Sequence, residues 1–402
     1  MANVSSSNGL EKRPKLRFPG FDEPYRKCRI GDIYAERSQR GAGDMELLSV
    51  TMNDGVMPRS EIEGKDNSSE DKSNYKVVCK GDMVYNSMRM WQGANGVSNY
   101  DGIVSPAYTV LMPTEEIDNQ YFAALFKTSN LINEFRKNSQ GLTSDTWNLK
   151  YPQIRPIRLY IPSLQEQNKI SSFIGTLEER IGKQRQLVDA LKKYKRGVMQ
   201  KVFRNMSAFS PSGFETVRLS DIFKKVYRRN SNGEIKNVIT NSAEHGLIPQ
   251  RDFFDKDIAV DGNTGNYYVI EYGDFVYNPR KSNTAPYGPF NRYERQEKGI
   301  ISPLYTCLVL KADIEPAYLA WYFKSDAWYR YIYDNGSQGV RHDRVSMTDD
   351  LLMGMPVIIP SKDSQIKIAK LLDCLEKRFQ VELSQCEYLK TVREALLQQL
   401  FI

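Results

Sequence analysis

Residues 163–203 read SLQEQNKISSFIGTLEERIGKQRQLVDALKKYKRGVMQKVF and predict one long helix on which the rest of the chain is organised. Apolar residues recur along it at alternating steps of four and three, a period of 3.5 that is typical of a coiled-coil seam. Ser163 can cap the first turn, and Glu166 three residues later completes a capping box. Gln184 and Lys195 are the two polar positions in the seam. The apolar seam positions are Ile170, Ile174, Leu177, Ile181, Val188 and Leu191, followed by Val198 and Val202.

The same helix pattern returns 198 residues later, at the C-terminal end of the chain. An Ile-Pro-Ser tripeptide precedes each copy, at 161–163 and at 359–361, and the polar breaks fall at the same steps, Glu382 and Arg393. The apolar positions of the second copy include Ile368, Leu372, Leu375, Phe379, Leu389 and Leu396. Shared period, breaks and flanks indicate a tandem repeat rather than two unrelated surface helices.

The sequence before each helix repeats as well. Gly-Asp-Met-Val-Tyr-Asn at 81–86 matches Gly-Asp-Phe-Val-Tyr-Asn at 273–278, and Gly-Ile-Val-Ser-Pro at 102–106 matches Gly-Ile-Ile-Ser-Pro at 299–303. The matched blocks are glycines, prolines and short β-rich runs, which specify a fold, whereas the segments between them differ in length. A helix is also expected over 119–136. Two domains with one framework and different loops suit two related ligands that differ in detail.

These patterns predict an α+β protein with two similar mixed α/β domains, each followed by a long helix. The predicted parts are a disordered tail (1–14), a first variable domain (15–162), a central helix (163–203), a linker (204–215), a second variable domain (216–360) and a C-terminal helix (361–402).

Composition narrows the class of protein. The formal charge of +7 indicates a mild preference for polyanionic partners. No run approaches 18 apolar residues and the N-terminus lacks the features of a signal peptide, so we expect no membrane span and a cytoplasmic protein. Five scattered cysteines and two isolated histidines argue against a disulfide framework or a structural metal site.

No catalytic motif is present. Asn-Pro-Arg-Lys at 278–281 begins like the Asn-Pro-Pro-aromatic motif of adenine methyltransferases but lacks its second proline and its aromatic residue. Gly182-Lys183 lies within the long helix without the upstream glycine of a P-loop, and no glycine-rich nucleotide motif occurs. We therefore expect no catalytic residues and no metal ligands.

The variable loops carry side chains that read base edges or stack on bases. Arginine and lysine can grip guanine, and asparagine and glutamine can grip adenine. The alternative interpretation is that these are ordinary polar loops. Taken as sets, the loop residues favour contact with DNA. The candidates in the first domain are Arg89, Trp91, Gln92, Asn95, Gln140, Thr143, Trp147, Asn148 and Lys150. Those in the second are Arg280, Lys281, Asn283, Tyr287, Gln338, Arg341, His342 and Arg344.

This layout resembles the DNA specificity subunit of type I restriction–modification systems. The segments Lys-Leu-Arg-Phe-Pro-Gly-Phe at 15–21 and Ile-Pro-Ser-Leu-Gln-Glu-Gln at 161–167 are similar to recurring segments of that family. The second helix departs slightly, with Ser-Lys-Asp-Ser-Gln at 361–365. The resemblance covers the chain from about residue 15 to its end.

The resemblance implies that each variable domain is a target recognition domain that reads one half of a split double-stranded DNA sequence. It implies that the two helices pair as an antiparallel coiled coil with pseudo-twofold symmetry and set the spacing between the halves. It implies two methyltransferase subunits that supply S-adenosylmethionine and methylate adenine. It allows for two restriction subunits that use ATP and magnesium. The chain itself would hold no cofactor. Two alternatives stay open: a stand-alone bipartite DNA-binding regulator, and a scaffold whose coiled coil binds only protein.

Overall fold

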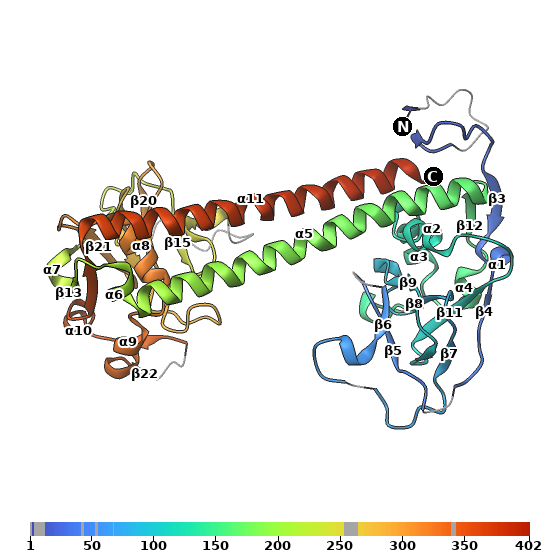
Figure 1. The fold of residues 1–402 in the computed structure, drawn as a ribbon, viewed down its shortest axis with the longest axis horizontal. Helices are drawn as coiled ribbons and strands as arrows, with labels where there is room; N and C mark the ends of the chain where they lie inside the picture. The colour runs from blue at the N-terminus through green and yellow to red at the C-terminus, as the bar shows by residue number, and fades with distance from the viewer. Residues whose placement is uncertain are drawn as a thin grey trace. The chain divides into compact units, whose positions relative to one another are not determined.

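The computed structural model describes residues 2–3, 13–41, 44–52, 55–66, 68–252, 264–338 and 343–402. It contains two compact units, one formed by Met1–Gln186 with Ser384–Ile402 and the other by Leu187–Leu383. Helices α5 (Leu164–Arg204, green) and α11 (Lys362–Leu400, red) each run from one unit into the other (Figure 1). Both lie within one or two residues of the predicted bounds. Most of the predicted tail, 1–14, lies outside the described residues.

The first unit is built around an antiparallel four-stranded sheet in the order β4-β11-β8-β9, with β3 pairing β12, β5 pairing β6 and β7 pairing β10. Its strands are β1 (Ala2–Asn3), β2 (Leu16–Arg17), β3 (Arg26–Arg29), β4 (Tyr34–Glu36), β5 (Leu48–Thr51), β6 (Gly55–Pro58), β7 (Lys76–Val78), β8 (Met83–Asn86), β9 (Asn95–Val97), β10 (Gly102–Val104), β11 (Tyr108–Pro113) and β12 (Arg158–Ile161). Its helices besides the long ones are α1 (Ile30–Ile33), η1 (Arg59–Glu61), η2 (Met90–Gln92), α2 (Asn119–Leu125), α3 (Ser129–Asn138), η3 (Ser144–Thr146) and α4 (Tyr151–Ile154).

The second unit repeats this topology, with the sheet order β14-β21-β18-β19 and with β13 pairing β24. Its strands are β13 (Phe214–Arg218), β14 (Phe223–Lys225), β15 (Ile239–Ser242), β16 (Gly246–Pro249), β17 (Tyr268–Ile270), β18 (Phe275–Tyr277), β19 (Phe290–Arg292), β20 (Gly299–Ile301), β21 (Thr306–Leu310), β22 (Ser337–Gln338), β23 (Val345–Ser346) and β24 (Pro356–Pro360). Its shorter helices are α6 (Met206–Phe209), α7 (Leu219–Ile222), η4 (Gln250–Asp252), α8 (Pro316–Lys324), α9 (Tyr329–Asn335) and α10 (Asp349–Met353). The predicted fold class is confirmed.

Each unit buries parts of both long helices in its own core. In the first unit Ile170 and Ile174 of α5 and Leu400 of α11 join the domain core, and Phe401 packs against Tyr121 with ring centroids 5.1 Å apart. In the second unit the core takes in Val202 and Phe203 from α5 and Ile368 and Leu372 from α11. The segment 204–215, expected as a linker, contains α6, the first two residues of β13 and the buried side chain of Met206. The end of each helix is therefore part of a domain core.

The seam residues of both helices are buried or half-buried in the structure. Among the predicted positions, Leu177, Leu191, Leu375, Phe379 and Leu396 are half-buried. The buried positions are Ile170, Ile174, Ile181, Val188, Ile368, Leu372 and Leu389. Among the described residues, no helix is apolar over enough of its length to cross a membrane.

The predicted helix over 119–136 is wrong, because the structure contains two helices there. Thr128 is buried, and both its amide and its hydroxyl donate to the carbonyl of Leu125. This hydrogen bonding ends α2 and starts α3 at a new angle. Ser325 separates α8 from α9 in the second unit in the same way, through its hydroxyl and the Tyr322 carbonyl. The break therefore belongs to the repeat.

The predicted capping box at the start of α5 is also wrong. Glu166 is 1% exposed and its carboxylate accepts from the Arg17 guanidinium at 2.9 and 2.8 Å and from the Tyr25 hydroxyl at 3.2 Å. The hydrogen bond that Arg17 donates to Glu166 raises the pKa of Arg17. A buried carboxylate needs such a partner more than the helix end needs a cap. The side chain of Glu166 therefore ties the N-terminal segment to α5.

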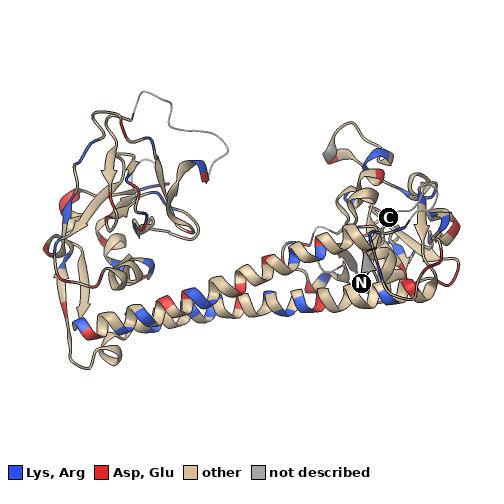
Figure 2. Ribbon diagram, turned by 90° about the horizontal axis from the view of Figure 1, so that it is seen from above, with Lys and Arg blue, Asp and Glu red and all other residues tan. Residues whose placement is uncertain are grey.

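Two ion pairs relate the helices by the same register. In the first unit Arg393 pairs with Glu178, and in the second unit Lys195 pairs with Glu376, with Lys195 Nζ also 4.5 Å from the ring centroid of Phe379. Arg393 lies 198 residues after Lys195, and Glu376 lies 198 residues after Glu178, so the two pairs are one interaction repeated. Figure 2 shows basic (blue) and acidic (red) residues interspersed along both helices. The polar breaks of the seam thus fix an antiparallel register within each unit.

We expect Arg393→Glu, which sets two carboxylates against each other, to lower the free energy of unfolding by about 0.5–1 kcal/mol, because the pair is partly exposed. Adding Glu178→Lys should restore that loss in urea unfolding. Lys183→Glu, at an exposed ion pair within α5, is the control for a change of charge outside the register. Failure of the second substitution to rescue the first would contradict this register.

Candidate nucleic-acid interface

The two candidate loops of the first unit lie together. One follows β8 and the other lies between α3 and α4. The Leu149 amide donates to the Ser87 carbonyl at 2.8 Å, and the rings of Trp91 and Trp147 meet edge to face with centroids 5.2 Å apart. Asn86, the last residue of β8, accepts from the amide of Met88 at 3.0 Å and so starts the first loop. Residues 56 and 62 positions apart in the chain therefore form one surface.

The first loop offers a mixed polar and aromatic surface. Arg89 is exposed, and its guanidinium lies 3.4 Å from Oε1 of the half-buried Gln92. Trp91 is half-buried and donates its indole N–H to the Met88 carbonyl at 3.0 Å. Its ring is therefore available for stacking but its N–H is not free for a base. The Arg136 guanidinium lies 5.9 Å from the Trp91 ring centroid, and the residue-by-residue prediction missed it.

Asn95 does not belong to this surface, so its prediction as a DNA contact is wrong for this structure. Its side chain is 0% exposed, its Nδ2 donates to the Gly93 carbonyl at 3.1 Å, and it sits in β9 opposite Tyr85. The helix η2 ends at Gln92, and Gly93, with φ +83°, turns the chain toward β9, which begins at Asn95.

The second loop is closed by main-chain hydrogen bonds. The amides and carbonyls of Gln140 and Asn148 pair at 2.9 and 2.8 Å. Inside it the Thr143 amide donates to the Thr146 hydroxyl at 3.2 Å, and that hydroxyl donates to the Thr143 carbonyl at 3.0 Å. Gln140, Thr143 and Lys150 are exposed, whereas Trp147 and Asn148 are half-buried. A loop held in this way presents its side chains at fixed positions.

The second unit joins its two candidate loops at the corresponding place. Asn278, like Asn86, ends its strand region and accepts the amide of Arg280 at 2.9 Å. The Lys281 amide then donates to the Asp343 carbonyl at 2.8 Å, and Val345 donates to the Pro279 carbonyl at 2.9 Å. This brings Arg280 and Arg344 opposite each other in an antiparallel bridge.

The surface around this bridge is basic. The guanidinium groups of Arg280 and Arg344 lie 3.8 and 4.0 Å from the Asp343 carboxylate, so each is held only loosely. Lys281 is half-buried and Asn283 is exposed. Tyr287 packs against Tyr329 with ring centroids 5.0 Å apart. Arg341 and His342 lie outside the described residues, as does the side chain of Gln338.

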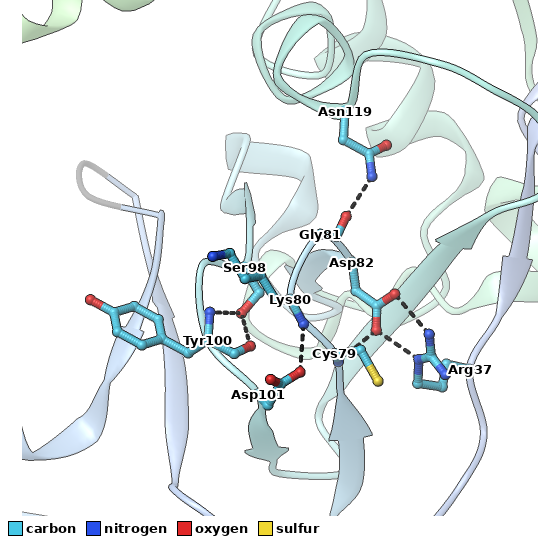
Figure 3. Close-up of polar contacts among 9 residues, drawn as sticks. All are labelled: Arg37, Cys79, Lys80, Gly81, Asp82, Ser98, Tyr100, Asp101 and Asn119. Carbon is cyan, nitrogen blue, oxygen red and sulfur yellow. Dashed lines mark hydrogen bonds and ion pairs between the residues drawn. The ribbon is translucent and has the colours of Figure 1, made fainter.

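A pinned turn positions the strand that leads to the first loop (Figure 3). Asp82 accepts from Arg37 Nε at 2.7 Å, from Arg37 Nη2 at 3.0 Å and from the Cys79 amide at 2.8 Å, and Asn119 Nδ2 donates to the Gly81 carbonyl at 2.6 Å. Gly81 has φ +96°, a conformation that favours glycine. In the second unit Asp274 likewise pairs with Arg228 and accepts from the Glu271 amide. Both loops thus leave equivalent, rigidly held strands.

The described residues were also compared with the requirements of a metal site and of a reactive thiol. No group of three or more histidine, cysteine, aspartate or glutamate side chains gathers as a metal site among the described residues. The described cysteines are free thiols, and burial raises the pKa of Cys28 to about 11 and that of Cys307 to about 12. Such thiols are poor nucleophiles.

Comparisons with known proteins point to one kind of protein. The family described as "Type I restriction modification DNA specificity domain" matches residues 27–193. A curated protein of Methanocaldococcus jannaschii, provisionally described as the specificity subunit of type I restriction enzyme MjaX, is 22% identical over 169 residues. That alignment covers 39% of this chain and only 38% of the relative.

Solved structures share the fold over nearly the whole chain. The S subunit of a type I restriction-modification system from M. genitalium aligns with a TM-score of 0.57 at 13% identity, over 97% of this chain and 99% of that one. A chain from a structure described by the assembly and conformational transition of the type I R-M system gives 0.59 at 16% identity, over 96% and 99%. The HsdS subunit of Thermoanaerobacter tengcongensis gives 0.50 at 16%, over 96% and 97%. At these identities the similarity establishes a shared fold.

Proposed function

We propose that this chain, whose residues 27–193 match the type I restriction modification DNA specificity family, is a member of that family and reads a split DNA sequence for partner adenine methyltransferase subunits. The family is one of specificity subunits, not of catalytic subunits. Sequence-specific DNA recognition is therefore the chain's own task, and methylation is the task of its partners.

The observation that carries the proposal is the same pair of loops at the same place in both units. Each pair leaves an equivalent strand after an asparagine turn, and each is joined by main-chain hydrogen bonds. The framework is repeated but the side chains on the loops differ, with two tryptophans in one pair and two opposed arginines in the other. Two readers of this kind suit a target with two different half-sites.

The long helices support a fixed spacing between the two DNA-recognition domains of this proposal. A helix of 41 residues is ~60 Å long at about 1.5 Å per residue, and α5 is continuous from one unit into the other. The repeated ion pairs hold it to α11 in one register in each unit. The length of the helices then sets the number of base pairs between the half-sites.

The partners follow from the proposed task. In this proposal the chain supplies recognition of the target, and two methyltransferase subunits bring S-adenosylmethionine. Two restriction subunits that use ATP and magnesium are further partners of this proposal. One of the similar solved structures concerns complex assembly of the type I R-M system, which supports association with other subunits. The DNA-bound complex would work in the cytoplasm.

Coexpression with a neighbouring methyltransferase tests the proposal. We expect a complex of one copy of this chain and two of the other, and long-read sequencing should show adenine methylation at a split motif. Specific DNA binding by the chain alone, without a methyltransferase complex, would favour a stand-alone regulator. Partner binding without any specific duplex would favour a protein scaffold.

Binding should also depend steeply on salt. If the complex neutralises about eight phosphates, log K should fall with log salt at a slope of roughly −7, because each contact contributes about −0.9. Arg89→Gln should reduce the slope by about 1 if Arg89 contacts phosphate, and Lys183→Gln on the exposed face of α5 is the matched control. A slope near zero would contradict DNA as the ligand.

A further inference from the structure

Leu142 stands out among the exposed apolar residues of the first unit. Its side chain is 102% exposed, whereas the other large apolar side chains on this unit's surface retain part of their packing. It lies near the tip of the loop closed by Gln140 and Asn148. A fully solvated leucine gains nothing for the fold of the free chain, and it loses about 1.5–3 kcal/mol relative to a buried one.

The backbone that carries Leu142 is held rather than loose. Gly141 has φ +142°, and a Cβ there would lie 2.6 Å from the Thr146 carbonyl oxygen, so only glycine fits. The reciprocal hydrogen bonds of Thr143 and Thr146 close the other side of the tip. Trp147, next to Asn148 at the base of the loop, packs on Trp91. The loop presents Leu142 at a fixed position.

The repeat contains the same arrangement in its sequence. Gln-Gly-Leu at 140–142 corresponds to Gln-Gly-Val at 338–340, at the offset of 198 that relates the long helices. Other matched aliphatic pairs are explained by burial: Val84 and Val276 are fully buried, and so are Ile103 and Ile300. Burial in the fold does not explain an aliphatic residue shared at the position of Leu142.

We infer that Leu142 is an apolar wedge that enters the first half-site and partly unstacks one base step. The inference rests on the proposed function. Proteins that bend DNA insert leucine and similar side chains between base pairs, and unstacking costs a few kcal/mol that burial of the wedge and added contacts offset. The loop contains one carboxylate, Asp145, but Arg89, Arg136 and Lys150 lie on the elements joined to it, which favours DNA as the occupant.

The test uses the complete methyltransferase complex and a duplex with the motif identified by methylation sequencing. Single 2-aminopurines replace bases of the first half-site in turn, except the methylated adenine, which must itself leave the stack. We expect the 2-aminopurine fluorescence to increase at one base step when the wild-type complex binds. Leu142→Ser should abolish that signal and weaken specific binding roughly 10- to 100-fold, with non-specific binding and complex assembly unchanged.

Two variants make the result specific. Leu142→Met keeps an apolar wedge and should keep the fluorescence signal. Met112→Ser removes an exposed apolar side chain from the same unit, at the end of β11 away from Asn86, and should change neither signal nor affinity. If the fluorescence increases at no base step, or if the Leu142→Ser complex retains the increase, the inference that Leu142 is a wedge is overturned. Loss of complex assembly in Leu142→Ser would also overturn it, because the residue would then contact protein. If no motif is methylated and no duplex is bound specifically, the proposed function itself fails.

Discussion

Leu372→Asp should prevent the second unit from folding. Leu372 is 0% exposed in a core that also contains Phe203 of α5 and Tyr318 and Tyr322 of the domain. A carboxylate there has to ionise in an apolar core or stay protonated, and an uncompensated buried charge costs about 3–5 kcal/mol. That is a large part of the stability of an ordinary domain, typically about 5–15 kcal/mol. We expect insoluble protein, or loss of the cooperative urea transition of this unit.

The preceding residue supplies the control. Leu371 is 42% exposed on the same turn of α11, so Leu371→Asp should change the free energy of unfolding by less than about 0.5 kcal/mol. Leu375→Asp, at a half-buried seam position, should lie between the two. Should Leu372→Asp give no soluble protein, Leu372→Ala remains measurable, with an expected loss of about 2–5 kcal/mol. Equal stability of the Leu371 and Leu372 aspartate variants would mean that α11 does not pack in this register.

The long helices could be predicted because their signal is long and occurs twice. The 3.5-residue period from Ile170 to Val202 contains many positions, and an error at one of them changes neither the start nor the end of the helix. The repeat then supplied an independent copy of the polar breaks, and the structure puts Lys195 and Arg393 into equivalent ion pairs. Local periodicity and internal repetition were sufficient for the fold class.

The contacts made by single polar residues could not be predicted in this way. Glu166 has the spacing of a capping box, but its partner is Arg17, 149 residues away, and no local pattern shows that distance. Asn95 reads as a polar loop residue, yet it lies inside the sheet because η2 ends three residues earlier. The two candidate loops of each unit are joined by main-chain hydrogen bonds, such as the one from Leu149 to Ser87. Main-chain hydrogen bonds of this kind do not depend on the identity of the side chains, so the sequence does not reveal them.

Exchange of the second recognition domain should change one half of the recognised sequence and nothing else. The graft should replace 206–360 rather than begin at 216, because Met206 is buried in the core of that domain. Both helices stay intact, so the spacer should keep its length, and the first half-site should be unchanged because its loops are untouched. Methylated motifs from long-read sequencing are the measurement.

The boundary contacts decide which donor domains are suitable. Phe203 packs on Tyr318 and Tyr322 with ring centroids 5.9 and 5.6 Å apart, and Gln365 accepts from the Glu315 amide at 2.8 Å while donating to the Pro360 carbonyl at 2.8 Å. The first unit makes the matching hydrogen bonds through Gln167, with Asp118 and Pro162. A donor that keeps these aromatic and N-cap residues should fold on the existing helices, since the contacts belong to the framework rather than to the loops.

A point substitution gives the same test at a single base pair. Arg344 is half-buried, faces Arg280 across the loop bridge and is held only loosely by Asp343. If it makes a bidentate base contact, Arg344→Ala should cost about 1–3 kcal/mol and relax one position of the second half-site. Arg330→Ala, at an exposed ion pair within α9, should leave the motif unchanged.

A graft that altered both half-sites, or changed the spacer with α5 and α11 intact, would mean that the two units form one composite surface. The repeat would then describe the ancestry of the fold and not two separable readers.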